Sequence, residues 1–137
     1  MMTRRTALAA GLAGAGALSL AACGNAPPSA ASLKRLPANQ TIATLADIKI
    51  GEAVSATLAG ADVVVARPTA TTAVCFSAVC THQGCTVRPA GSQLDCPCHG
   101  SVFDATTGKV LQGPAPSPLP PIAVTVRNGS VVSAGTV

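Results

Sequence analysis

The sequence predicts a small all-β domain built from short antiparallel strands. Its 137 residues leave room for one domain. Short runs of β-type residues alternate with glycine-containing turns, and no segment of the domain shows a convincing helical period of 3.6 residues. The chain has two Phe and neither Tyr nor Trp, so its hydrophobic core must be thin. A thin core is usually supported by disulfides or by a metal, and the chain has six cysteines.

The N-terminal residues have the layout of a bacterial export signal. Arg4 and Arg5 precede an uncharged apolar run that ends in small residues and is shorter than the roughly 20 residues of a membrane-spanning helix. The arginine pair resembles the twin-arginine export motif, and Leu20-Ala21-Ala22-Cys23 resembles a lipobox, in which the cysteine is lipidated. We expect a signal peptide over residues 1–22 and a lipoprotein held by Cys23 on the outer face of the cell membrane. An uncleaved signal kept as a weak anchor is the alternative.

A flexible tether is expected over residues 23–38, which are rich in Pro, Ala and Ser and show no period. The folded domain is then expected to span residues 39–137. The net charge of +4 comes from the leader and the tether, because basic and acidic residues balance from Asn39 onward. Nucleic acid is therefore not an expected partner.

Two β-hairpins are the strongest local predictions within the domain. In each, two strand-like runs flank a short glycine-containing turn, and Asn-Gly is the strongest such turn signal. A further run follows the first hairpin. The expected strands are Val54–Leu58 and Asp62–Arg67 around Ala59-Gly60-Ala61, then Ala73–Val79, then Ile122–Arg127 and Ser130–Ala134 around Asn128-Gly129.

Five of the six cysteines and both histidines lie between positions 75 and 99. Most of them form two boxes of six residues each. Box 1 is Cys80-Thr81-His82-Gln83-Gly84-Cys85, and box 2 is Cys96-Pro97-Cys98-His99-Gly100-Ser101. Thiolate and imidazole ligands suit zinc, copper or an iron–sulfur cluster, whereas magnesium and calcium prefer oxygen ligands. The boxes therefore predict a centre where two loops converge.

Three other uses of these residues are less consistent with the pattern. Zinc held by Cys80, His82, Cys96 and His99 would leave one residue between the first two ligands, unlike the usual zinc-finger spacing. A blue copper site typically needs a weak axial ligand such as Met, and neither methionine lies in the domain. A framework of three disulfides would use the proposed lipid-bearing cysteine and leave both histidines unexplained.

The two boxes closely resemble the cluster-binding boxes of the Rieske iron–sulfur proteins. The resemblance covers both boxes and the Pro-rich stretch that follows them. It implies a Rieske-type [2Fe-2S] cluster in a small antiparallel β-sandwich, with a cluster-binding subdomain formed by two loops. By this resemblance, Cys80 and Cys96 bind one iron, and His82 and His99 bind the other. Neutral imidazoles in place of two thiolates raise the reduction potential of such a cluster.

The resemblance also implies roles for residues around the ligands. Cys85 and Cys98 match the pair that forms a disulfide in the respiratory branch of the family, a pair that the ferredoxins of ring-hydroxylating dioxygenases lack. Gly84 and Gly100 would let the backbone approach the cluster closely. Ser101 matches a serine that donates a hydrogen bond to a bridging sulfide.

Phe103 stands where high-potential members of the family carry a tyrosine that hydrogen-bonds a ligand sulfur. Because phenylalanine has no donor, the sequence predicts a lower potential than in those members. The Pro-rich stretch, with Gly113, Pro114 and Pro116, would cover the cluster from a third side, although a stiff connector is the alternative. The remaining cysteine, Cys75, is expected to be a buried apolar residue in a strand.

The predicted function is one-electron transfer, as a carrier or redox subunit of an oxidoreductase rather than a stand-alone enzyme. The carrier would serve a membrane or periplasmic oxidoreductase, and its redox partner would dock near His82 and His99. Two alternatives stay open. One is the quinol-oxidising Rieske subunit of a cytochrome bc-type complex, against which Phe103 and the short spacing between the boxes count. The other is a zinc-bound structural or interaction module.

Overall fold

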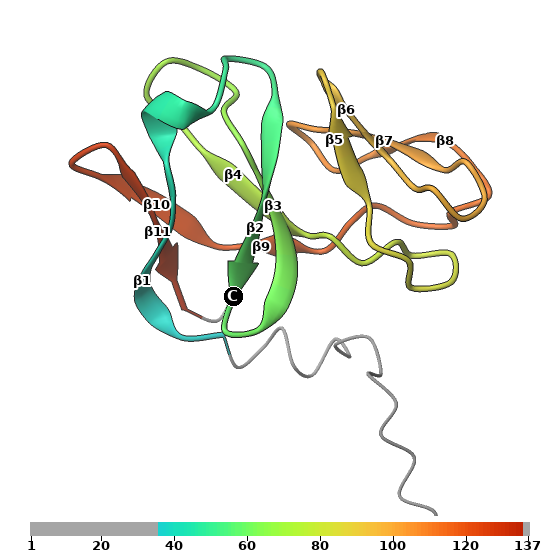
Figure 1. Cartoon of the computed structure of the whole chain (residues 1–137), viewed down its shortest axis with the longest axis horizontal. Helices are drawn as coiled ribbons and strands as arrows, with labels where there is room; N and C mark the ends of the chain where they lie inside the picture. The colour runs from blue at the N-terminus through green and yellow to red at the C-terminus, as the bar shows by residue number, and fades with distance from the viewer. Residues whose placement is uncertain (1–35, 136–137) are drawn as a thin grey trace, which may run out of the picture.

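The computed structural model describes residues 36–135. Within that range the chain is all-β, with eleven strands in three antiparallel sheets (Figure 1). The described range also contains one short 3-10 helix, η1 (Leu45–Asp47). The first sheet has the order β1-β11-β10 and contains β1 (Ala38–Thr44), β10 (Val124–Arg127) and β11 (Ser130–Ala134). The second has the order β2-β3-β4-β9 and contains β2 (Ala53–Leu58), β3 (Ala61–Ala66), β4 (Val74–Ser77) and β9 (Pro121–Ile122). The third has the order β5-β6-β7-β8 and contains β5 (Arg88–Ala90), β6 (Gln93–Asp95), β7 (Val102–Asp104) and β8 (Val110–Gln112).

Both predicted hairpins are confirmed. β2 pairs with β3 around Ala59 and Gly60, and β10 pairs with β11 around Asn128 and Gly129. All four turn residues have positive φ angles, between 49° and 80°. Two consecutive residues with positive φ match the right-handed twist of a two-residue hairpin, which is why glycine stands second in each turn.

Strand β3 explains how a small chain supports two hydrophobic cores. Successive side chains of a strand point to opposite faces of its sheet. Val63 and Val65 pack with residues of the first sheet and of η1, whereas Val64 and Ala66 pack with residues of the third sheet and the two boxes. β3 is therefore buried on both faces, and the second sheet lies between the other two.

The domain begins slightly earlier than the predicted residue 39. Leu36 is buried in the core beneath the first sheet, and β1 starts at Ala38. The last residues assigned to the tether thus belong to the folded part. Arg4, Arg5, Cys23 and most of the tether lie outside the described residues. Within the described range, no helix is both long and apolar enough to span a membrane.

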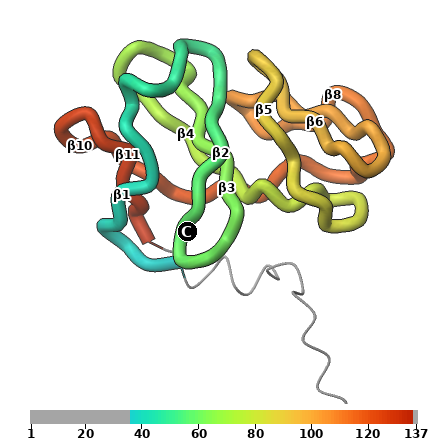
Figure 2. Tube along the Cα trace, viewed as in Figure 1, coloured from blue at the N-terminus to red at the C-terminus, as the bar shows by residue number. Residues whose placement is uncertain are grey.

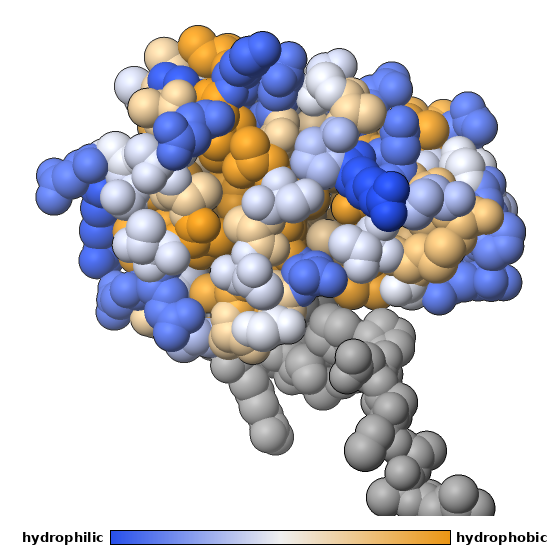
Figure 3. Space-filling model, in the orientation of Figure 1, coloured by the Kyte–Doolittle hydropathy of each residue, from blue (hydrophilic) through white to orange (hydrophobic). Residues whose placement is uncertain are grey.

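The third sheet and both boxes form a lobe inserted between two paired strands of the second sheet. The chain leaves β4, builds the lobe and returns in β9, which pairs with β4 at Cys75↔Ile122 and Phe76↔Pro121. Figure 2 shows this lobe beside the two other sheets. The face in Figure 3 mixes apolar and polar residues, with hydrophilic ones at the tip of the β10–β11 hairpin.

The β7–β8 turn is held by Asp104. Its carboxylate accepts hydrogen bonds from the backbone N–H groups of Thr106 and Thr107 and from the Thr106 hydroxyl, at 2.8–2.9 Å. Burial opposes the charged form of this carboxyl, but the hydrogen bonds outweigh it and lower the pKa of Asp104.

Gly108 in this turn packs tightly against the second sheet. Its φ is +71°, and a Cβ atom there would lie 2.8 Å from Cε1 of Phe76 and 3.3 Å from the carbonyl oxygen of Leu119. We expect Gly108→Ala to lower the free energy of unfolding by about 2–4 kcal/mol, combining the left-handed backbone cost with the cost of overpacking. Urea denaturation measures the change.

Gly91→Ala is the matched control, because Gly91 also has a positive φ, +60°, but a Cβ atom there meets nothing within 4 Å. It should show only the backbone cost, about 1–2 kcal/mol. Equal losses in the two variants would contradict the steric role of Gly108.

Candidate metal centre

The two boxes fold into turns with the same hydrogen-bond pattern. In box 1, the N–H of Cys80 donates to the carbonyl of Cys85 at 2.7 Å, and the N–H of Gly84 donates to the carbonyl of Cys80 at 2.9 Å. In box 2, Cys96 donates to Ser101 at 2.8 Å, and Gly100 donates to Cys96 at 3.1 Å. Each turn thus presents its first cysteine from an equivalent backbone position.

Both turns need glycine at the fifth position. Gly84 and Gly100 have φ angles of 78° and 77°, which disfavour side chains of ordinary residues. The sequence suggested a close approach of backbone to cluster as the reason for these glycines. A Cβ atom on Gly100 would meet no protein atom within 4 Å, so the backbone conformation of the turn is the requirement that the protein itself imposes.

The thiols of Cys80 and Cys96 point into the interior of the lobe. Both side chains are buried, both are free of disulfides, and both belong to the core shared by the second and third sheets. The pKa of Cys80 is raised, mainly by burial and further by the neighbouring Cys96 thiol. The backbone N–H of His82 and the hydroxyl of Ser101 oppose that shift. The two predicted thiolate ligands are therefore neighbours in a dry environment.

The two predicted imidazole ligands also meet. The rings of His82 and His99 lie 4.9 Å apart, centroid to centroid, and are nearly perpendicular at 89°. His99 is exposed and His82 is half-buried. The Nδ1 atom of His82 is buried and has no hydrogen-bond partner. A buried nitrogen without a partner is costly, and a metal ion is one group that would satisfy it.

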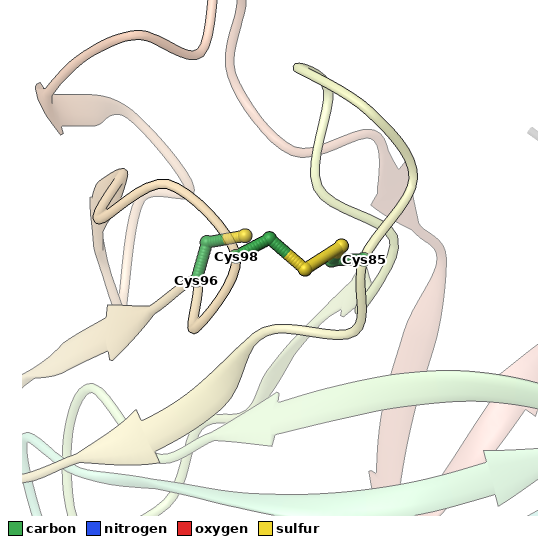
Figure 4. Close-up of side chains that lie close together, drawn as sticks. All are labelled: Cys85, Cys96 and Cys98. Atoms are coloured by element: carbon green, nitrogen blue, oxygen red, sulfur yellow. A yellow bond between two sulfur atoms is a disulfide. The ribbon is translucent and has the colours of Figure 1, made fainter.

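A disulfide joins the two boxes between Cys85 and Cys98, as expected from the family resemblance (Figure 4). The Cα atoms of the two residues are 6.4 Å apart, and 13 positions separate them in the sequence. The sulfur atoms of Cys85, Cys98 and Cys96 all lie within 4.8 Å of one another. Because two of these sulfurs are bonded to each other, this group of three does not form a metal site as it stands.

The Pro-rich segment, residues 113–121, is hydrogen-bonded to both boxes. The Thr81 hydroxyl of box 1 donates to the carbonyl of Ser117 at 2.7 Å, and the N–H of Ala115 donates to the Ser101 hydroxyl of box 2 at 3.0 Å. Pro114, which follows a cis peptide bond from Gly113, is exposed, as is Pro116. The segment therefore lies against both boxes.

Sequence reasoning did not assign a role to Thr81, Ala115 or Gln112. The side chain of Gln112 donates from Nε2 to the carbonyl of Gly100 at 3.3 Å and so links β8 to box 2. Thr81 carried a weak signal, since it lies inside a box. Gln112 carried no signal in the sequence, because its contact with Gly100 depends on how the third sheet brings β8 beside box 2.

Ser101 and Phe103 are both fully buried beside the thiols. Ser101 accepts the hydrogen bond from Ala115, and its hydroxyl opposes the rise in the pKa of Cys80 that burial causes. Phe103 pairs with Leu94 across β6 and β7 and packs in the same core as Cys80 and Cys96. Its ring brings no donor to this core.

Cys75 lies away from the centre. It is buried in β4 and packs in the core beneath the first sheet, as predicted. Burial raises the pKa of its thiol to about 12, against a smaller opposing effect of the Phe76 backbone. A thiol with this environment stays neutral and unreactive.

The donor set fits a Rieske-type cluster. Two buried free thiols and two facing imidazoles, one of them with an unpartnered buried nitrogen, supply the mixed sulfur and nitrogen ligands of such a cluster. Among the described residues, no three of these four donor atoms form a group within 4.8 Å of one another. A single zinc ion gathers its ligands around one point, so it fits this arrangement less well.

Comparisons with known proteins agree with this geometry. Residues 38–124 match the family described as "Rieske [2Fe-2S] domain". The cytochrome b6-f complex iron-sulfur subunit of Synechococcus sp. (strain WH7803) is 48% identical over 58 residues, covering 41% of this chain and 32% of that protein. The cytochrome b6-f complex iron-sulfur subunit 1 of Nostoc sp. (strain PCC 7120 / SAG 25.82 / UTEX 2576) is 48% identical over 59 residues. This match covers 42% of this chain and 32% of that protein. The chain thus spans about a third of the length of these curated relatives.

Two solved structures extend the comparison. The cyanobacterial plasma membrane Rieske protein from Synechocystis PCC 6803 is 31% identical, with a TM-score of 0.61, over 70% of this chain and 99% of that one. The ferredoxin of carbazole 1,9a-dioxygenase from Nocardioides aromaticivorans IC177, at 24% identity and a TM-score of 0.59, covers 73% of this chain and 100% of its own and shares the fold. The predicted all-β class, the Rieske-type [2Fe-2S] cofactor and a role in electron transfer are thereby confirmed, and the chain belongs to the Rieske [2Fe-2S] domain family.

Proposed function

We propose that this protein is a one-electron carrier whose cluster is held by Cys80 and Cys96 on one iron and by His82 and His99 on the other. The observation that carries the proposal is the placement of these four side chains on two equivalent turns joined by a disulfide. When bound, the cluster supplies the chemistry by cycling between two iron valence states. The protein contributes ligation, shielding and a path for the electron.

Shielding and orientation come from the groups around the thiols. The core of the lobe encloses Cys80 and Cys96 and excludes water from their side of the centre. The Pro-rich segment covers a third side, held to box 1 through Thr81 and to box 2 through Ser101. The disulfide prevents the two loops from separating, so each ligand keeps its place.

A redox partner would dock at the histidine edge. His99 is exposed and His82 half-buried, whereas both thiols are buried, so the shortest route for an electron to the surface runs through the imidazoles. Described residues carry equal numbers of basic and acidic side chains, which gives no support for a nucleic-acid partner. The partner proposed here is a membrane or periplasmic oxidoreductase.

Export and lipidation are proposed from the leader alone. Arg4 and Arg5 with the following apolar run support twin-arginine export, and Cys23 in its lipobox supports a lipid anchor on the outer face of the cell membrane. Mass spectrometry of the membrane-bound protein tests this: lipid attached to Cys23 as the new first residue is the expected result. A Cys23→Ala variant that keeps the same membrane fraction would contradict the anchor.

A second candidate is the quinol-oxidising subunit of a cytochrome bc-type complex. The 48% identity to cytochrome b6-f iron-sulfur subunits favours it, but this match covers only 32% of such a subunit. Phe103 also counts against this second candidate, because it lacks the hydroxyl of the tyrosine that high-potential members of the family carry at this position. Co-purification from solubilised membranes separates the candidates, because the second requires a stable complex with a cytochrome b.

Spectroscopy tests the cofactor assignment. Purified full-length protein is expected to be coloured, and its reduced form is expected to give a low-temperature EPR signal with an average g value below that of the free electron. Colourless protein that contains zinc and no iron would overturn the proposal in favour of the zinc-bound module.

The missing hydroxyl at Phe103 is expected to keep the reduction potential of the cluster low. We expect Phe103→Tyr to raise the midpoint potential by about 40 mV, because a hydroxyl donor near the ligand sulfurs favours the reduced, more negative cluster by about 1 kcal/mol. A redox titration followed by EPR measures the shift. Phe76→Tyr is the matched control, since Phe76 is buried in the same core but lies on β4, and it should leave the potential unchanged. No rise in Phe103→Tyr would contradict this role.

A further inference from the structure

A free thiol of the centre lies next to the disulfide that joins the two boxes. Cys96 is a free thiol, and its sulfur lies within 4.8 Å of both sulfurs of the Cys85–Cys98 bond. In Figure 4 the Cys96 sulfur stands on the Cys98 side of this bond. Cys80, the other free thiol of the centre, is not part of this group. Among the described residues, Cys96 is therefore the free cysteine positioned beside the disulfide.

We propose that, in protein that carries no cluster, Cys96 is the nucleophile of an internal thiol–disulfide exchange. Its thiolate attacks the sulfur of Cys98, the Cys96–Cys98 bond forms and the Cys85–Cys98 bond breaks. Cys85 leaves as a thiolate and takes up the proton that Cys96 gave up. One disulfide replaces another, so the step needs no external oxidant or reductant.

Position selects Cys98 as the sulfur under attack. In Figure 4 the Cys96 sulfur stands on the Cys98 side of the bond, so we take Cys98 as the sulfur that is attacked. Residues two apart in a turn have Cα atoms about 5–6 Å apart, within the range that a disulfide spans. The product is a disulfide between Cys96 and Cys98, both within box 2.

The exchange would disable the centre in two ways. It consumes Cys96, a proposed iron ligand, and it removes the covalent link between box 1 and box 2. Iron bound to Cys96 would occupy the same sulfur and so protect the disulfide. This protective effect, and the use of ligand variants as cluster-free protein, rest on the proposed function; the exchange itself depends on the three sulfur positions.

Two full-length variants test the exchange, because each lacks one proposed ligand and they differ in the nucleophile. Cys80→Ser keeps Cys96, and Cys96→Ser removes it. Each protein is denatured with N-ethylmaleimide to trap free thiols and then cleaved, without reduction, before its aspartates. Cleavage at Asp95 separates box 1, in residues 62–94, from box 2, in residues 95–103.

In Cys80→Ser we expect the two peptides to come apart, with N-ethylmaleimide on Cys85 and an internal disulfide in residues 95–103. In Cys96→Ser they should stay joined through Cys85 and Cys98. Joined peptides in both variants would overturn the proposal. Peptides joined through Cys85 and Cys96 would overturn the choice of Cys98 as the attacked sulfur.

Wild-type protein provides a second measurement that does not depend on how well the variants fold. Before metal removal the native pairing should be found, and after anaerobic treatment with a chelator the Cys96–Cys98 pairing should appear. Native pairing at both times would contradict the proposal. The exchange is tested by a peptide map, whereas the cofactor assignment is tested by spectroscopy. Failure of one proposal can therefore be told apart from failure of the other.

Discussion

Replacing Cys96 or His99 by alanine is expected to abolish cluster binding, lowering bound iron by at least about 100-fold. Loss of a partner that only orients a metal ligand already costs roughly 10–100-fold in affinity, and loss of the ligand itself costs more. The two residues lie on the same turn but serve different irons in our assignment. Iron content per chain and the visible absorption spectrum both measure the effect.

Cys75→Ala is the control for the ligand variants. Cys75 is also a buried free cysteine, but it packs in the core beneath the first sheet and not at the boxes. The variant should keep its full iron content while losing some stability from the smaller side chain. Iron retained in Cys96→Ala, or lost in Cys75→Ala, would show that the ligand assignment is wrong.

The disulfide is expected to contribute about 3 kcal/mol to the free energy of unfolding. It closes a short loop, since 13 positions separate Cys85 from Cys98, and in the loop-entropy treatment a loop of about 15 residues gives about that value. The double variant Cys85→Ala/Cys98→Ala should therefore unfold at a lower urea concentration. Because the link also holds the boxes together, the variant should lose iron faster than wild type.

The comparison is made on the metal-free forms as well as on the loaded ones. Metal-free protein isolates the contribution of the cross-link, whereas loaded protein adds the contribution of iron binding. A double variant with the same urea midpoint and the same rate of iron loss as wild type would rule out a stabilising role for this bond.

Local residue patterns predicted much of the fold. Asn128-Gly129 and Ala59-Gly60 specify hairpins because the conformation of a two-residue turn is decided by the turn residues themselves. The glycines of the boxes carry a similar local signal. Strand β3 is different: its near-continuous apolar run reads as a strand, but only the packing of sheets on both of its faces explains why Val63 and Val64 are each fully buried.

The sequence by itself determined the chemistry of this protein: two thiols, two imidazoles and a further cysteine pair, spaced so that two short turns present them. The tertiary structure decided which of these groups meet. Thr81 reaches Ser117, Gln112 reaches Gly100, and the Cys96 sulfur lies beside the disulfide. Such contacts arise when a lobe inserted between β4 and β9 folds back on itself, because sheet packing brings together residues whose local patterns carry no information about one another.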